Sequence, residues 1–496
     1  FLNVMSYKNL KILFEEQSLI NDISGILNWD MATYMPENSR RQRIKQITKL
    51  YDYKKNIFNV IKKNEFFNKV NEFELDKFDK INFELMKNKF DYFNSISVDK
   101  LKKKAELSIE CEGLWREAKE KSNFNIVKNS FVKLVNLIKE ESEILSQIKD
   151  KKKYDCLLFK YDRSLDSKQL FKIFRRVEKF LKKKLPLIIK KQKNIEFNDF
   201  LNEEDQFNLS KIFMKQLGFD FSRGRIDKSL HPFCGGGTQD VRITTRFTEE
   251  DSFSCFDALM HETGHALYEQ GLPQKWAHQP IGSAGGMSLH ESQSLFVEMQ
   301  IIKSLPVSQF IQQILKDKLG KDPNVWSSEV IYNIRNSVTP GYIRVDSDEV
   351  HYPLHIIHRF NIEYKVIEED ANVEYLPDLW NEEFSKTLGL DVHDDKSGCL
   401  QDIHWYGGDF GYFPTYSIGA FIAAQLACKV RTELINYDLN LKEGNFKPII
   451  KWLRENIHNR GNFLKIDELL EESTDEKLNL KYFENHIIDR YIKKEI

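Results

Sequence analysis

The chain has 496 residues, enough to bury a large core in one body or in two or three domains. Its 74 Lys and Arg residues against 75 Asp and Glu residues leave a net charge of −1, which excludes a general attraction to nucleic acid or acidic membranes. Local Lys runs at residues 151–153 and 182–184 are expected to be solvated helix faces.

The cysteines and the start of the chain bear on its compartment. The six cysteines are scattered and form no C-x-x-C pair, which favours free thiols in a reducing compartment. The chain as given opens on Phe1, without a basic-then-apolar leader. Its longest small-and-apolar run, about residues 417–428, is shorter than the roughly 20 residues of a membrane span. We therefore expect a cytoplasmic protein with neither a membrane nor a nucleic acid as partner.

The N-terminal region, about residues 1–230, is predicted to be helical. Between Glu37 and Leu185 there is no proline and a single glycine, Gly113, and apolar residues recur every three or four positions. This pattern is typical of long amphipathic helices packed on one another. A strand-rich region would need turn residues every 8–12 positions, and this stretch lacks them.

The character of the chain changes in the middle region, about residues 231–420. Val241, Ile243, Thr245 and Phe247 alternate with polar residues, which predicts a half-buried strand in a small sheet. Gly-rich loops are expected at residues 271–286 and 398–419, and helices again from about 421 to 496. Since no repeat or low-complexity linker separates these regions, we expect one domain over 1–496.

The strongest chemical signal is the H-E-x-x-H sequence at residues 261–265. Thr248 and Asp251 predict a helix start before it, and Gly271 and Pro273 a stop after it. On a helix of about 100° and 1.5 Å per residue, His261 and His265 lie roughly 40° and 6 Å apart, so both imidazoles reach one metal ion. Glu262 lies beside them, placed to take a proton from a water activated by that ion.

The third metal ligand decides the subclass. A metzincin would have Gly at position 268 and His at position 271, where this chain has Tyr268 and Gly271. The first candidate is therefore Glu291, in a helix expected to open near Ser288. Glu291 could instead be the capping-box partner of Ser288. The rival ligands are Glu298, Glu269 and His290.

Two histidines, one glutamate and an open fourth position are the pattern of a catalytic zinc site.

Further motifs extend this pattern over nearly the whole chain. They are H-P-F at 231–233, D-x-R-x-T at 240–244, H-E-S at 290–292, I-R-x-x-x-D at 343–348, G-x-x-Q-D-x-H-W at 398–405 and G-Y-F-P-T-Y at 411–416. With these motifs the chain resembles the thermostable carboxypeptidase (carboxypeptidase Taq) family of zinc metallopeptidases.

The resemblance implies a mainly α fold, a large multi-helix body around a deep active-site cleft with one small β-sheet near the metal. It also implies a homodimer, a Zn²⁺ or Co²⁺ cofactor, and removal of C-terminal residues with broad specificity from peptides with a free C-terminus. The ligands carried over are His261, His265 and Glu291, with Glu262 as general base. The chain departs from the residues usual in the family at five positions, Ser347, His351, Pro353, Val297 and Met299. Pro353 is expected to start or kink its helix beside the substrate pocket.

Other roles follow from what peptide hydrolysis needs. The oxyanion needs a donor beside the metal, and Tyr412, Tyr416 and His404 are the candidates. A free substrate carboxylate is best held by a guanidinium, for which Arg344 is the first candidate and Arg242 the second. His231 is a weaker candidate for the same pocket. The strand that carries Arg242 could pair with an extended substrate backbone as an added strand.

Two alternatives stay open. A dipeptidyl carboxypeptidase or oligopeptidase would use a similar H-E-x-x-H plus Glu site, and a non-catalytic helical scaffold could keep the fold. The second is disfavoured because a scaffold has no need of Glu262. The glycines at 235–237 do not form a phosphate loop, since no Lys-Ser or Lys-Thr follows them.

Overall fold

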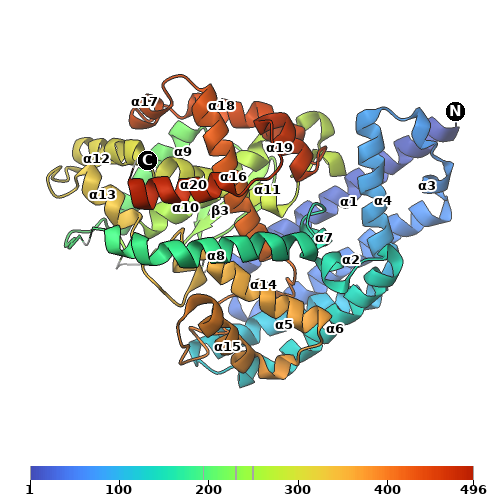
Figure 1. Cartoon of the computed structure of the whole chain (residues 1–496). Coiled ribbons are helices and arrows are strands. Elements are labelled where there is room, and N and C mark those ends of the chain that lie inside the picture. Colours follow the sequence, from blue (N-terminus) through green and yellow to red (C-terminus); the bar gives the residue numbers. More distant parts are fainter. Residues whose placement is uncertain (1, 194, 230–231, 248–250, 495–496) are drawn as a thin grey trace.

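The computed structural model describes residues 2–193, 195–229, 232–247 and 251–494. The first helices form an arm at one edge of the molecule, where α1, α3 and α4 lie beside the N-terminus (Figure 1). This arm has its own small core, built from residues such as Leu10, Phe14, Phe58 and Met86. The helices of this part are α1 (Leu2–Thr33), α2 (Arg40–Lys63), α3 (Phe66–Lys69) and α4 (Lys77–Ser95).

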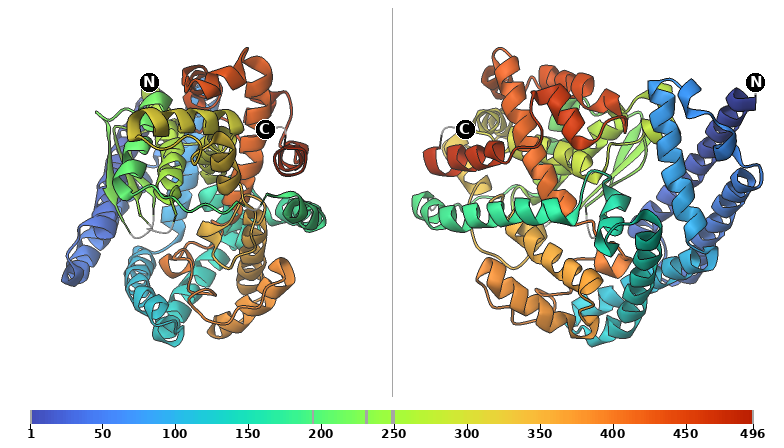
Figure 2. Two further views of the ribbon diagram at one scale, coloured as in Figure 1. Left: turned by 90° about the vertical axis from the view of Figure 1, so that its left-hand side faces the viewer. Right: turned by 45° about the vertical axis from the view of Figure 1, so that its right-hand side comes forward.

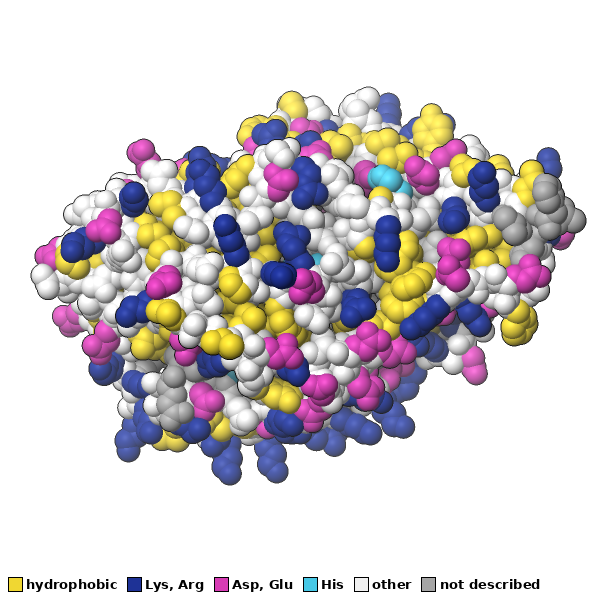
Figure 3. All heavy atoms as spheres, turned by 90° about the horizontal axis from the view of Figure 1, so that it is seen from above, with side chains coloured by type: hydrophobic (Ala, Val, Ile, Leu, Met, Phe, Trp, Pro, Cys, Tyr) yellow, Lys and Arg dark blue, Asp and Glu magenta, His cyan; other side chains and the backbone are white. Residues whose placement is uncertain are grey.

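The helices predicted for the rest of the N-terminal region are confirmed. They are α5 (Val98–Glu120), α6 (Asn125–Lys149), α7 (Lys153–Tyr161), α8 (Ser167–Lys191) and α9 (Glu203–Leu217). Lys182 and Lys183 of α8 are exposed, as expected of a solvated helix face. Seen from above, Lys and Arg side chains crowd along the lower edge of the molecule, while both charge signs are interspersed elsewhere on that face (Figure 3).

A single three-stranded sheet is present among the described residues, made of β1 (Gly224–Lys228), β2 (Cys234–Gly237) and β3 (Asp240–Thr245). The predicted strand is β3. Val241, Ile243 and Thr245 are buried as expected, but Thr244 on the opposite face is buried too, and its hydroxyl accepts from Phe233 N at 3.0 Å. The strand β3 lies in the middle of the sheet. It pairs in parallel with β1 and antiparallel with β2. Both edges of β3 are therefore occupied, and the prediction that a substrate adds a strand to it is wrong.

The second half of the chain is helical around this sheet, and the sheet lies between α10 and α1 (Figure 2). The predicted Gly-rich loop at 398–419 ends early, because α16 begins at Pro414. The helices are α10 (Ser254–Gly271), α11 (Met287–Leu295), the π-helix η5 (Phe296–Ile302), α12 (Leu305–Leu319), α13 (Ser328–Arg335), α14 (Tyr352–Glu368), α15 (Leu376–Leu388), α16 (Pro414–Glu433), α17 (Tyr437–Lys442), α18 (Lys447–Asn456), α19 (Ile466–Thr474), α20 (Lys481–Ile487) and the π-helix η10 (Ile488–Lys493).

One continuous hydrophobic core joins these elements, from Leu107 of α5 to Tyr491 of η10. It contains the buried faces of α10, α11 and α16, so the motif-bearing helices are held by the largest packed part of the molecule. Within the described ranges, no helix combines the length and the apolar character needed to cross a membrane.

Candidate metal centre

The helix α10 carries the H-E-x-x-H motif. It begins at Ser254, later than predicted, and Asp251 accepts a hydrogen bond from Phe253 N at 2.8 Å just before it. Thr248, the predicted cap, lies outside the described residues. The predicted end at Gly271 is confirmed.

Glycines bring the ligand-bearing helices together. A Cβ on Gly264 would lie 2.4 Å from Gln293 O, so α11 packs directly against the backbone of α10. On the other side of α11, a Cβ on Gly419 of α16 would lie 2.7 Å from Glu291 Cβ. Since α11 is held between two glycine surfaces, Glu291 has no room to turn away from α10.

Three ligand atoms converge between these helices. Glu291 Oε2 lies 3.2 Å from His265 Nε2 and 3.6 Å from His261 Nε2, and ligand atoms of the three residues all lie within 4.8 Å of one another. The second oxygen, Glu291 Oε1, is buried and has no hydrogen-bond partner. Glu291 is thus not a capping partner of Ser288, and the donor set fits a divalent metal ion.

The rival ligands form an outer layer that orients the imidazoles. Glu298 Oε2 contacts His261 Nδ1 at 2.9 Å, and His290 Nδ1 contacts His265 Nδ1 at 2.6 Å. Glu269 Oε1 in turn contacts His290 Nε2 at 2.7 Å. If His290 donates to Glu269, its Nδ1 accepts the proton of His265 Nδ1. Both ligand histidines then turn an unprotonated Nε2 towards Glu291, as metal-bound histidines with carboxylate partners do.

The charges of the site call for a cation. Burial raises the pKa of Glu262 to about 7, against the opposing pull of His261, and lowers the pKa of His265 to about 4. Burial would also lower the pKa of His261, but Glu291, Glu298 and Glu262 outweigh it and raise that pKa to about 10. Glu262 Oε2 is buried without a partner, as is Glu291 Oε1. These buried carboxylates have mainly imidazoles as their polar neighbours, and a bound divalent ion would stabilise their negative charge.

The three candidate oxyanion donors lie together. His404 Nε2 contacts the Tyr416 hydroxyl at 2.8 Å, and the Tyr412 ring lies 5.2 Å from that of Tyr416. Burial raises the pKa of Tyr416, and the carboxylates of Glu291 and Glu262 raise it further. Tyr416 is therefore a protonated donor next to the ligands.

Arg344 packs against Tyr416, with its guanidinium carbon 4.9 Å from the centre of that ring. It is 5 % exposed and donates to Asp402 Oδ1 from NH2 at 2.8 Å and from Nε at 3.1 Å. Arg359, which is fully buried, donates to the other oxygen of Asp402 at 2.7 Å. Two guanidinium groups thus share one carboxylate. Arg359 was not found from the sequence, because nothing local in α14 marks it.

Comparison with known proteins shows the family of the chain. The family model described as carboxypeptidase Taq (M32) metallopeptidase matches residues 9–491. The chain belongs to the carboxypeptidase Taq (M32) family of metallopeptidases.

Relatives of this M32 chain include Carboxypeptidase 1 of Bacillus subtilis (strain 168), 31% identical over 97% of this chain and 96% of that protein. Thermostable carboxypeptidase 1 of Pyrococcus furiosus is 34% identical over 76% of each. Among solved structures, Trypanosoma cruzi metallocarboxypeptidase 1 superimposes with a TM-score of 0.92 at 32% identity, over 98% of this chain and 99% of that one. The M32 chain is a metallocarboxypeptidase that acts on peptides.

Arg242, the second candidate for binding the substrate carboxylate, does not join the cluster in this metallocarboxypeptidase. Arg242 donates to Asp240 at 2.8 and 3.0 Å, and its guanidinium carbon lies 4.4 Å from the Trp29 ring. The positive charge of Arg242 is thus balanced by one carboxylate. His231 lies outside the described residues.

The departures from the usual family text leave the metal ligands untouched. Pro353 is in the first turn of α14, so it starts this helix, as one of the two expectations had it. Asp348 accepts from His351 Nδ1 at 2.7 Å just before the helix. Val297 and Met299 are buried in η5, and Ser347 donates to the Asp348 carbonyl at 3.3 Å.

Proposed function

We propose that this metallocarboxypeptidase holds Zn²⁺ on His261, His265 and Glu291, uses Glu262 as general base, and releases single C-terminal residues of broad side-chain type. The observation that carries the proposal is the convergence of the three ligand atoms beside a buried, unpartnered Glu262 oxygen. A zinc ion in such a site supplies a Lewis acid that polarises the scissile carbonyl and brings the pKa of water to about 7.

Glu262 is the proton carrier of the proposal. Its carboxylate takes a proton from the attacking water and returns it to the leaving amine, which is general base and then general acid catalysis. Without a bound cation, burial raises the pKa of Glu262. A bound cation would lower it again, so the carboxylate would be ionised and able to accept a proton near neutral pH. Tyr416 donates to the oxyanion in this proposal. If His404 carries its proton on Nε2 and donates to the Tyr416 oxygen, the hydroxyl proton is free for this purpose.

Arg344 is the proposed anchor for the substrate carboxylate. Asp402 balances only one of the two guanidinium groups that it contacts, so the cluster keeps a surplus positive charge. Burial lowers the pKa of Arg359 to about 10, although Asp402 opposes the shift. An incoming carboxylate would supply the missing negative charge. Arg242 lacks such a surplus because Asp240 neutralises it.

A product ladder tests the proposal. The zinc-loaded protein is incubated with one mixed-sequence peptide and with its C-terminally amidated form, and the products are identified by mass spectrometry. We expect single residues lost stepwise from the free acid, slow cleavage of the amide, and no cleavage after chelation. Release of dipeptides or internal fragments would favour the oligopeptidase alternative. Equal cleavage of both peptides would refute the Arg344 anchor. Homodimerisation and a cytoplasmic location stay predictions.

A further inference from the structure

The helix that carries Glu291 changes its winding just after this ligand. α11 continues without a break into η5, a π-helix, in which each turn takes up an extra residue. Lys303 N accordingly donates to Glu298 O, five residues back, at 3.0 Å. Four residues after Ile302 stands Pro306, which has no N–H to offer the Ile302 carbonyl. Buried carbonyls in such a segment need donors from other parts of the chain.

The donor for the Ile302 carbonyl is Arg335, at the end of α13. Its NH1 donates to Ile302 O at 2.8 Å, and its NH2 is paired with the carboxylate of Asp257. The guanidinium carbon lies 5.0 Å from the Phe253 ring, and the Arg335 side chain is 1% exposed. Asp257 lies in α10, one helical turn before His261. Arg335 therefore bridges the end of η5 and the helix that carries the two histidine ligands.

A second arginine holds the same π-helix from the C-terminal end of the chain. Arg490 of η10 donates to Met299 O at 2.7 Å and to Glu349 at 3.0 Å. Glu349 also accepts from the Tyr491 hydroxyl at 3.0 Å. Both arginines thus use one arm of the guanidinium for a carbonyl of η5 and another for a carboxylate, half-buried in Asp257 and buried in Glu349.

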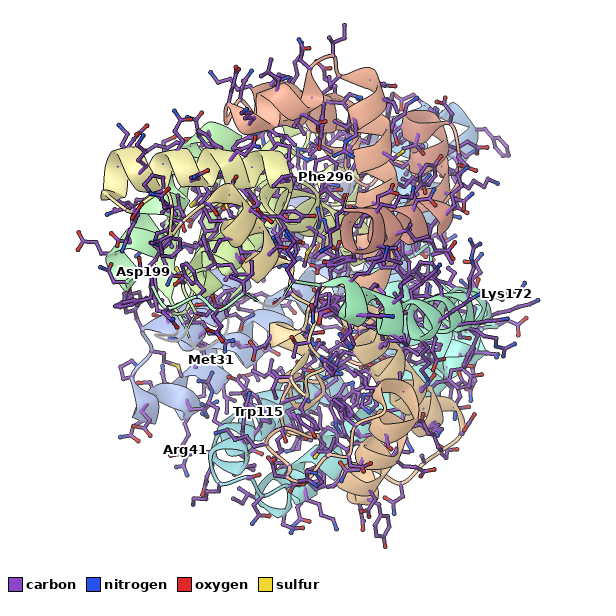
Figure 4. All side chains as sticks on the ribbon, turned by 60° about the vertical axis from the view of Figure 1, so that its left-hand side comes forward. Met31, Arg41, Trp115, Lys172, Asp199 and Phe296 are labelled. Carbon is purple, nitrogen blue, oxygen red and sulfur yellow. The ribbon has the colours of Figure 1, made fainter. Side chains whose placement is uncertain are left out.

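Glu298, the residue that contacts His261 Nδ1, directly precedes Met299, the first of these two anchored residues. Its other oxygen accepts from Lys303 Nζ at 3.0 Å. Any shift of η5 along α10 changes the contact between Glu298 and His261, and with it the direction of His261 Nε2. Figure 4 places Phe296, the first residue of η5, deep among the helices, and its side chain is fully buried. Side-chain motion of Glu298 alone cannot compensate in such a packed site.

We propose that Arg335 is a positioning residue of the metal centre, which fixes η5 against α10 and thereby sets the orientation of His261 through Glu298. Arg490 holds the middle of the same segment through the carbonyl of Met299. The planar fork of an arginine serves a carbonyl and a carboxylate at once, and a lysine in its place keeps the charge but gives up one of the two partners. The inference rests on the proposed metal site, since it concerns the geometry of His261 as a ligand.

The test uses metal binding by Arg335→Lys. The metal-free parent and variant are titrated with Co²⁺, whose visible absorption reports ligand geometry, and with Zn²⁺ in competition with a chromophoric chelator. We expect an altered cobalt spectrum and a zinc dissociation constant about 10–100-fold higher in the variant, the range seen when partners of metal-bound histidines are lost. Asp257→Asn, which keeps the side-chain size and removes the negative charge that ties Arg335 to α10, gives a second test should Arg335→Lys fold poorly.

Arg43→Lys is the matched control. Arg43 is also buried, and it also contacts one carbonyl, that of Leu27, and one carboxylate, that of Asp30, but between α1 and α2. The Arg43→Lys substitution should lower the melting temperature and leave the cobalt spectrum and the zinc affinity at the parent's values. Parent-like spectra and affinities in both Arg335→Lys and Asp257→Asn would overturn the inference alone. A parent protein that takes up no metal would overturn the proposed function as well.

Discussion

The replacement Glu262→Gln separates proton transfer from metal binding. The Glu262 side chain is 6% exposed and its Oε2 has no partner, so the isosteric amide fits the same space. None of the three converging ligand atoms belongs to Glu262. The variant should therefore keep one equivalent of metal and lose the general base. Such a loss is worth roughly 10²–10⁴ in kcat, or about 2.7–5.4 kcal/mol at 1.36 kcal/mol per tenfold change.

The assay measures kcat from the release of the C-terminal residue of a synthetic peptide, together with the metal content by elemental analysis. Glu269→Gln is the matched control, since Glu269 is a carboxylate on the same helix that contacts His290 and not the proposed reaction centre. With saturating metal, it should keep most of the parent's kcat. A kcat of Glu262→Gln within threefold of the parent would refute its role as base. Loss of metal from this variant would show instead that Glu262 is a ligand.

Three further predictions follow from the same contacts. Glu269→Gln should raise the zinc dissociation constant by about 10–100-fold, because His290 loses the partner that orients it towards His265; an unchanged constant in chelator competition would contradict this. Arg344→Met should raise KM for peptides with a free C-terminus far more than it changes kcat or zinc affinity, and should have little effect on amidated peptides. Burial alone would raise the pKa of Glu141, but Lys160 and Lys104 outweigh it and hold that pKa at about 2. Because the folded pKa lies below the ordinary value of 4.5, the stabilisation of about 3 kcal/mol is present above pH 4.5 and is lost as the pH falls towards 2. In urea titrations, Glu141→Gln should be less stable at pH 7 and should lose less stability on acidification, whereas parallel pH profiles would contradict this assignment.

The convergence of the two histidines could be predicted because helical geometry fixes it locally. His265 follows His261 by four positions along one helix, and that spacing alone turns both imidazoles to one side. Helical spacing alone could not predict the position of Glu291, since its orientation depends on how α11 packs between α10 and α16. The sequence left Glu298, Glu269 and His290 as rivals, because spacing along the chain does not distinguish a ligand from a residue that orients one.

The features that could not be predicted depend on contacts between distant segments. Arg359 and Arg344 meet at Asp402, 43 and 58 residues along the chain from them, and no periodicity marks such a cluster. The order of the strands in the sheet also depends on contacts between distant segments. The alternation in β3 shows that one face is buried but not whether the strand is central, and its place in the middle of the sheet is set by where β1 and β2 pair. The π-helix η5 could not be predicted either, because a run of mostly apolar residues does not distinguish a π-helix from an α-helix.

X-ray absorption at the zinc edge of the metal-loaded protein tests the central claim most directly. The account predicts one zinc per chain with two imidazole nitrogens at about 2.0–2.1 Å and carboxylate oxygen in the remaining shell, and the loss of one imidazole in a His265→Ala variant. A sulfur ligand, or a first shell without histidine, would contradict the site at His261, His265 and Glu291.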